Sequence, residues 1–381
     1  MGTDWYINQL RYKVNDSDPI DPIWSAAQIE GANRDIVYSP EGLYGNNATF
    51  LNKYRAKAGI TTDPSQPMDL YTMMKDYAGS DDPNKVEMGR DGSALNIFPS
   101  KRVSIPVDIN TVRQNGTVNA NDSVLSQIVF DISKNALFKN DAAILNIIAA
   151  NKWKRPIYFT SQGAGDLGFQ NYIRQDGLTY RLVPVANSQV NDAWAYDKMM
   201  TKFASGNADK PGVYFDEENR RHLNSIRMAY AVAAMDMAEK NKKPEAKKML
   251  NKVDKMMLEE NFPYGMVSRN QQHDYISVLM LQAAYAAGDT VLAAKITKSV
   301  KKDLEQQISY YASLDDNKIG NFDFADQSGR RGGDKNAAEQ FLMRIMQFEQ
   351  QYKAQSGVPP EIPGQMNIQP VPPKQRDTQK K

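Results

Sequence analysis

The chain has 381 residues, more than one domain usually contains, so two domains are expected. Its 47 basic and 45 acidic residues leave a formal charge of +2, which gives no overall field for steering the protein onto nucleic acid, and nucleic acid is not an expected partner. Because the chain has no cysteine, disulfides, thiolate metal sites and cysteine nucleophiles are excluded. The longest nearly apolar run, residues 142–150, is far shorter than the roughly 20 residues of a membrane-spanning helix.

The first part of the chain is expected to mix short helices and strands. A helix over residues 5–11 follows Asp4, whose carboxylate can cap it. A short strand is predicted at residues 36–38 and a helix at residues 68–77. Residues 103–108 alternate apolar and polar as a strand does. Because a proline has no N–H for a second neighbour, Pro106 predicts that this strand lies at the edge of its sheet.

A β-α-β unit is predicted at the centre of this part. Residues 127–132 and 157–159 have the apolar, β-rich composition of buried strands. Between them, apolar residues repeat at helical spacing over residues 139–151, and Asn140 and Asp141 can cap that helix. We expect the two strands to pair in parallel through a right-handed crossover and to form the core of the first domain.

Residues 163–168 spell Gly-x-Gly-x-x-Gly, the pattern of dinucleotide-binding loops. That chemistry needs the glycines to open a helix directly after a strand, and an acidic residue about 20 positions further on. The helix expected at residues 169–175 is too short, and the strand at residues 179–185 ends without a carboxylate. We interpret the segment as an ordinary loop and expect no cofactor.

From Asp192 the apolar pattern becomes helical and remains so. Aligning Met237 with Tyr285 superposes one predicted helix pair on the next, an offset of 48 residues (285 minus 237). Repeated helical hairpins with small residues at the crossings are typical of tetratricopeptide-like stacks, although the period exceeds the usual value of about 34. The predicted helices cover residues 219–240, 244–257, 274–287, 290–310 and 337–352.

These elements predict an α+β fold with three parts. An N-terminal α/β domain with a small mixed sheet around the β-α-β unit is expected at residues 1–190. A helical, tetratricopeptide-like repeat domain follows at residues 191–355. The proline-rich segment 356–381 is expected to be a disordered tail.

The chain offers little catalytic chemistry. His222 and His273 lie on separate predicted helices without a carboxylate or histidine at ligand spacing, so we interpret both as helix-surface residues and expect neither a catalytic residue nor a metal ligand. Arg220 and Arg221, beside Asp216, can bind an anionic group, although ion pairing on the helix surface is the commoner role.

Aromatic side chains give a stronger indication of binding, because flat rings with polar tips hold sugars and peptides. Trp24, Trp153 and Trp194 are expected in the core. For Trp5, a core position and a surface position both remain open.

Four segments carry a resemblance to a known family: residues 2–10, 139–159, 177–185 and 211–217. In their order and spacing they resemble the protein-O-mannosyltransferase-like family of multi-span bacterial membrane proteins, which is similar to glycosyltransferases of the GT-C type. The resemblance implies that this chain is the soluble C-terminal region of such a protein. It implies a place on the periplasmic face of the inner membrane, with attachment through membrane spans outside this sequence.

The resemblance also implies a role. The parent would transfer a sugar from a polyprenyl phosphate to a protein hydroxyl with an acidic residue that this chain does not contain. This region would then be non-catalytic. Its binding partners would be the membrane-spanning region of the same protein, which lies outside this sequence, and an acceptor protein or envelope partner. The candidate binding residues are Asp4, Trp5, Tyr6 and Arg11, near the membrane interface, together with Arg220 and Arg221.

Two other functions remain open. A helical-repeat domain can act as a periplasmic scaffold for an envelope or secretion complex, with no link to sugar transfer. The aromatic side chains also fit a glycan-binding module.

Overall fold

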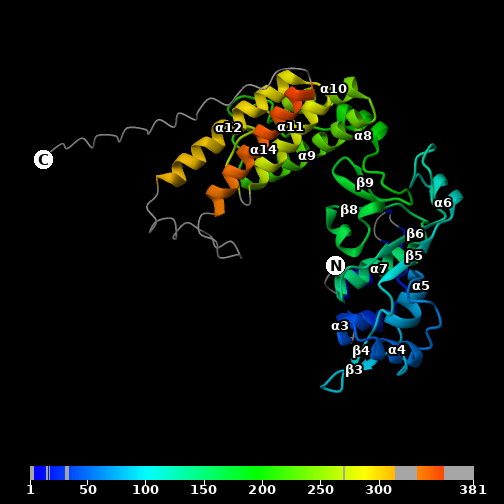
Figure 1. The fold of residues 1–381 in the computed structure, drawn as a ribbon. Coiled ribbons are helices and arrows are strands. Elements are labelled where there is room, and N and C mark those ends of the chain that lie inside the picture. The colour runs from blue at the N-terminus through cyan, green and yellow to red at the C-terminus, as the bar shows by residue number, and fades with distance from the viewer. Residues whose placement is uncertain are drawn as a thin grey trace.

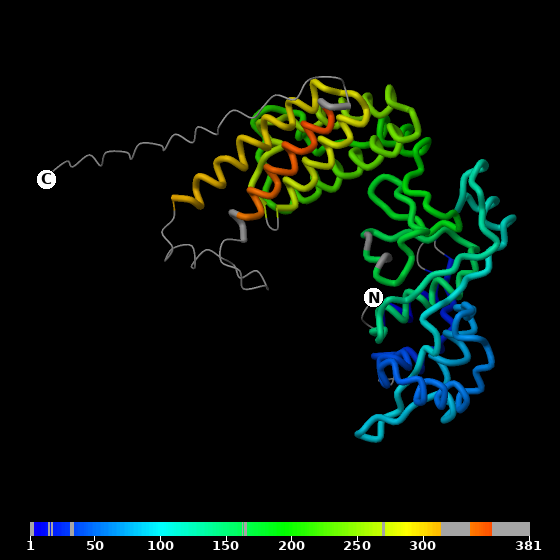
Figure 2. Tube along the Cα trace, viewed as in Figure 1, coloured from blue at the N-terminus to red at the C-terminus, as the bar shows by residue number. Residues whose placement is uncertain are grey.

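A computed structural model describes residues 4–13, 16, 18–30, 34–268, 271–313 and 333–355. Figure 1 shows two bodies of different architecture, one with strands and short helices from α1 to β10, the other with long helices from α8 to α14. The trace in Figure 2 runs from blue to green through the first body and from green to orange through the second, so each body uses a continuous stretch of chain. The α+β fold class is confirmed. The tail predicted at residues 356–381 lies outside the described residues.

Small sheets organise the first body. One pairs β1 with β7, another β3 with β4, and two three-stranded sheets have the orders β2-β5-β6 and β8-β10-β9. All of these pairings are antiparallel except β2 with β5. The strands are β1 (Ile36–Tyr38), β2 (Met68–Asp69), β3 (Glu87–Met88), β4 (Ala94–Leu95), β5 (Arg102–Pro106), β6 (Gln127–Asp131), β7 (Ala136–Phe138), β8 (Ile157–Phe159), β9 (Ile173–Asp176) and β10 (Thr179–Leu182).

Helices, most of them short, connect these strands. The strand predicted at residues 36–38 and the helix predicted at residues 139–151 are confirmed, whereas residues 68–77 hold a strand, one turn of α-helix and a π-helix. The helices are α1 (Asp4–Gln9), α2 (Ala26–Glu30), α3 (Pro40–Tyr44), α4 (Ala48–Lys57), α5 (Leu70–Thr72), the π-helix η2 (Met73–Ala78), α6 (Ile109–Gln114), α7 (Lys139–Asn151) and the 3₁₀ turns η3 (Gln162–Leu167) and η4 (Gln170–Tyr172).

The predicted parallel pairing of β6 with β8 is wrong. β6 pairs antiparallel with β5, and β8 pairs antiparallel with β10 in a different sheet. The hydroxyl of Tyr172 occupies the free edge of β6, because it accepts from the Val129 N–H at 3.3 Å and donates to the Val129 carbonyl at 3.0 Å. Those are backbone groups that a parallel neighbour would have needed, so one side chain closes the sheet there.

The edge position predicted for β5 is also wrong. β5 lies in the middle of its sheet, between β2 and β6. The parallel neighbour β2 reaches only Val103 and Ser104, while Pro106 is paired with Gln127 on the other side. The proline is tolerated because it stands at the end of the strand, beyond the reach of β2.

The helix predicted at residues 169–175 is wrong as well. This segment holds the short turn η4 and then β9, which forms a hairpin with β10. Gly177, at φ 63°, supplies the left-handed backbone conformation of the hairpin turn. The Gly-x-Gly-x-x-Gly segment forms the turn η3 and does not open a helix from the strand, in line with its interpretation as a loop.

The core of the first body surrounds α7, which is buried on most of its sides. Asp141 stands in the first turn of α7, where its carboxylate accepts from the Phe138 N–H at 3.4 Å and pairs with Lys134 at 2.9 Å. Trp24 and Trp153 lie in this core as expected. Trp194 is partly buried against the core of the second body.

The second body is a stack of helices. α9 packs against both α10 and α11, α12 packs against α11, and α14 covers α12. Alanines such as Ala233, Ala234, Ala283 and Ala284 are buried in this core. The helices are α8 (Asp192–Thr201), α9 (Glu217–Glu239), α10 (Lys243–Met256), α11 (Gln272–Ala286), α12 (Thr290–Ala312) and α14 (Gly333–Gln355), close to the ranges predicted from the sequence.

Candidate functional site

The candidate residues on α1 divide into those used internally and those exposed to solvent. Asp4 pairs with Lys139 at 2.7 Å, and Lys139 also pairs with Asp35 at 2.6 Å. Burial by itself would lower the pKa of Lys139, but the bonds to Asp35 and Asp4 outweigh it and raise that pKa. Asp4 therefore fastens α1 to the start of α7.

Arg11 has a similar structural role. Its guanidinium pairs with Asp21 at 2.9 Å and donates to the carbonyl of Trp24. Arg11 thus joins the end of the first helical segment to the segment that carries the buried Trp24, and much of its donor capacity is used within the chain.

Aromatic rings on the same segment face solvent. Trp5 is 68% exposed and Tyr6 47% exposed, which places Trp5 on the surface. Tyr12 is 70% exposed and was missed by the sequence reasoning, although its position in the same aromatic segment was a usable signal. Asp4 and Arg11 hold this segment in place, and we refer to its three exposed rings, those of Trp5, Tyr6 and Tyr12, as the aromatic surface.

The arginines at the start of α9 lie on the other body. Arg221 pairs with Glu218 at 2.8 Å, and both side chains are exposed. The guanidinium of Arg220 lies 5.6 Å from the centre of the Tyr214 ring. Within the described residues, no hydrogen bond or ion pair joins Arg220 or Arg221 to the α1 residues, so the structure does not bring the two predicted groups into one site.

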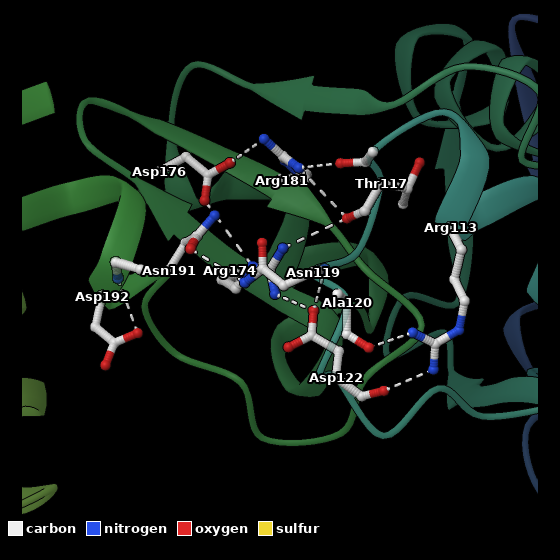
Figure 3. A network of polar contacts seen from close by, with 12 residues as sticks. Arg113, Thr117, Asn119, Ala120, Asp122, Arg174, Asp176, Arg181, Asn191 and Asp192 are labelled. Carbon is white, nitrogen blue, oxygen red and sulfur yellow. Dashed lines mark hydrogen bonds and ion pairs between the residues drawn. The ribbon is translucent and has the colours of Figure 1, made fainter. Parts of the chain in front are cut away.

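A buried ionic network, which the sequence reasoning missed, lies on the β9–β10 hairpin (Figure 3). Arg181 pairs with Asp176 at 2.5 Å, and Arg174 pairs with Asp122 at 2.7 Å. The guanidinium of Arg181 also donates to the Gly116 carbonyl at 2.6 Å. Charged residues at alternate positions of a strand, as at Arg174 and Asp176, were the signal that could have revealed it.

This network also reaches the start of the second body. Figure 3 shows Asn191 beside Asn119, and the Asn119 side chain donates to Asn191 Oδ1 at 3.1 Å. Burial raises the pKa of Asp176, although the charges of Arg181 and Arg174 act in the opposite direction. Since these charged groups form ion pairs with one another and are buried, the network serves to connect segments and is not open to a substrate.

A second buried polar cluster lies within the helical body. Arg227 donates to the carbonyls of Phe262 and Pro263 at 2.8 and 3.1 Å, and its guanidinium lies 4.2 Å from the Phe262 ring centre. His273 is fully buried, with Nε2 2.7 Å from the Pro263 carbonyl oxygen, so its predicted surface position is wrong. The segment around Phe262, inserted between α10 and α11, covers the start of α11, which the helical pattern alone did not reveal. His222 is exposed near Glu218, at 3.7 Å.

The described residues hold neither a candidate metal site nor a candidate membrane-spanning helix. In the described ranges, no cluster of three or more histidine, aspartate or glutamate side chains is placed to hold a metal ion. None of the described helices is both long and apolar enough to cross a membrane.

The sequence comparisons identify a family for the part of the chain that carries the aromatic surface and the ionic network. Residues 1–203 match the family described as TMEM260-associated domain 2, which is more than half of the chain. No curated protein and no solved structure matches the chain significantly. The matched residues include the first body and α8, and on this basis the chain belongs to the TMEM260-associated domain 2 family.

Proposed function

We propose that this chain is a non-catalytic accessory region of a TMEM260-like membrane protein that binds a protein partner at the membrane surface. TMEM260 is a protein-O-mannosyltransferase-like membrane protein, so the partner that fits best is the acceptor protein of a sugar transfer. The resemblance to protein-O-mannosyltransferase-like membrane proteins supports a position on the extracytoplasmic side, where an acceptor protein would be met.

The observation that carries the proposal is the stack formed by α9 to α14. Helical hairpins packed side by side expose long helix faces, and such stacks mostly bind other proteins. The polar side chains described above support a non-catalytic role. His273 and Arg227 are buried in the core, and Arg174, Asp176 and Arg181 form buried ion pairs with one another.

The exposed rings of Trp5, Tyr6 and Tyr12 support a position at the membrane surface. Tryptophan and tyrosine favour the headgroup level of a bilayer, where the ring is partly apolar and its polar tip stays hydrated. Asp4 and Arg11 hold the aromatic surface against the first body. The rings would therefore orient that body, and the helical stack with it, relative to the membrane.

Deletion of the helical body from the parent protein tests the proposal. A parent protein without residues 217–355 should lose transfer to a folded acceptor protein but keep transfer to a short synthetic acceptor peptide, because only recognition of the acceptor is impaired. The membrane level of the deletion variant is measured alongside, so that loss of the protein is not mistaken for loss of recognition. Unchanged transfer to the folded acceptor would refute the role in acceptor binding.

A further inference from the structure

The solvent-facing side of α10 forms an open groove with α8. Lys247, Lys248, Lys252 and Lys255 line it together with Met200 and Met256, and its volume is about 730 Å³. A space of that size can hold several side chains of a partner. Asp209 is the one acidic side chain in this lining.

The groove results from the amphipathic pattern of α10. Ala246, Met249, Leu250 and Val253 are buried in the core of the helical body. The lysines occupy the opposite face, since positions 248, 252 and 255 follow one another at helical spacing. Their positive charges are therefore gathered along one side of a single helix.

The positive charge of the groove is only partly balanced within the chain. Lys248 and Lys255 are exposed and form no ion pair with any described residue. Lys252 donates to the neutral carbonyl of Met200. The carboxylate nearest to Lys247 is Asp289 at 3.9 Å, which also caps α12 by accepting from the Leu292 N–H. Like charges at these spacings destabilise a helix, so the arrangement has a cost that an external anionic partner would remove.

The composition of the groove points to one class of occupant. Lysine ammonium groups are flexible point charges that suit carboxylates without a fixed geometry. The half-buried side chains of Met200 and Met256 offer an adaptable apolar surface. The lining contains no arginine for bidentate phosphate binding and no aromatic ring for base stacking.

We propose that this groove binds an acidic polypeptide segment of the partner, with its carboxylates at the four lysines and an apolar side chain against Met200 and Met256. The assignment rests on the proposed function, because it names the face of the helical body that holds the partner.

A peptide titration tests the groove. The probe is a short fluorescent peptide of glutamate and aspartate with one central leucine, titrated with the whole chain at low salt. The double variant Lys248→Glu/Lys255→Glu should bind it about tenfold more weakly, because two attractive contacts become repulsive. A peptide in which glycine replaces the leucine should also bind more weakly, since it cannot contact the methionines.

The matched control is Lys298→Glu/Lys302→Glu. These lysines are exposed on α12, form no ion pair with any described residue, and give the same change in net charge. Their reversal should change the affinity by less than about twofold. Equal weakening by both double variants, or no saturable binding of the peptide, would overturn the assignment. The assignment would also be overturned if Lys248→Glu/Lys255→Glu weakened binding of the chain to phosphatidylglycerol vesicles but left peptide binding unchanged.

The parent-protein assay separates this assignment from the proposed function. Lys248→Glu/Lys255→Glu should reduce transfer to the folded acceptor as the deletion of residues 217–355 does. If the deletion abolishes that transfer and the double variant leaves it intact, the proposed function stands and the groove assignment fails. If the deletion leaves transfer intact, the proposed function itself fails.

Discussion

The indole Nε1 of Trp153 donates a hydrogen bond to the Pro106 carbonyl oxygen at 2.9 Å and so fastens the end of α7 to the end of β5. The Trp153 carbonyl accepts from Asn115 Nδ2 at 2.6 Å, and only 5% of Trp153 is exposed. Trp153→Ala removes the ring and leaves the Pro106 oxygen unpaired. We expect it to lower the free energy of unfolding by about 3–5 kcal/mol in a denaturant melt. A change within measurement error would refute this structural role.

Trp5 lies in the same body as Trp153 but is exposed to solvent. Because its ring is 68% exposed, Trp5→Ala should change the free energy of unfolding by less than about 0.5 kcal/mol. If the aromatic surface meets the bilayer, the same substitution should weaken partition of the chain into lipid vesicles, measured by flotation. A large loss of stability without any change in partition would contradict the interfacial role.

Asp176 tests the buried ionic network. It is buried between Arg174 and Arg181, so Asp176→Ala leaves two guanidinium groups without their shared carboxylate. We expect the free energy of unfolding to fall by about 3–5 kcal/mol. Asp131→Ala is the control, because it breaks an exposed pair with Arg102, at 3.2 Å, and should cost less than about 1 kcal/mol. Similar losses in the two variants would mean that burial of the network contributes little.

The buried side chains of His273 and Asp274 should change the stability of the fold in opposite directions as the pH drops. Burial lowers the pKa of His273 to about 3, with the charge of Arg227 acting in the same direction. The unfolded histidine titrates near pH 6.5, so the unfolded state binds the proton first and stability falls as the pH drops from about 6.5 to 3. Burial, assisted by the charge of Asp303, raises the pKa of Asp274 to about 7. The folded state then binds that proton first, and stability rises as the pH drops from about 7 to 4.

The two effects oppose each other between about pH 6.5 and 4, at about 1.4 kcal/mol per pH unit each. Asp274→Asn removes only the effect that stabilises the folded state on acidification. Relative to the unmodified chain, the variant should therefore lose about 1.4 kcal/mol of stability per pH unit between about pH 6.5 and 4. Above about pH 8 the variant should be the more stable, because it no longer buries a carboxylate. Denaturant melts at several pH values measure both effects. The exposed substitution Asp197→Asn should follow the profile of the unmodified chain.

The sequence predicted local structure correctly where apolar residues repeat with one period over the whole length of an element. α7 and the long helices were found because their apolar residues repeat at helical spacing. Strand pairing was not predicted, because it depends on groups distant in the sequence. Tyr172, which closes the edge of β6, lies 43 residues from Val129 and carries no local signal of that role.

In the candidate site, too, local features were predicted and contacts between distant residues were not. Trp5 and Tyr6 were found because aromatic residues stand out in the sequence, and the structure places both rings on the surface. The internal roles of Asp4 and Arg11 were not visible, because Lys139 and Trp24 become their partners only in the folded chain. The burial of His273 depends in the same way on the Phe262 segment that folds over it.

We propose that the chain divides into its two bodies near residue 190. The junction is held by Asn191, whose N–H donates to the Gln175 carbonyl at 3.2 Å and whose Oδ1 accepts from Asn119. On the other side, α8 is attached to the helical body by Tyr230, whose hydroxyl donates to the Met199 carbonyl at 2.6 Å. Asn191→Ala removes the side-chain link to Asn119 but leaves the two cores intact.

We therefore expect Asn191→Ala to speed cleavage by thermolysin within residues 183–193, because opening of a segment governs its proteolysis. Mass spectrometry should then detect two resistant products, one from each side of the junction. Gln189→Ala is the matched control, since Gln189 is exposed and contributes its backbone carbonyl to the junction. Cleavage of the Asn191 variant at the rate of the control would show that Asn191 does not hold the junction. First cleavage within residues 140–160 would contradict the division itself, because α7 lies in the core of the first body.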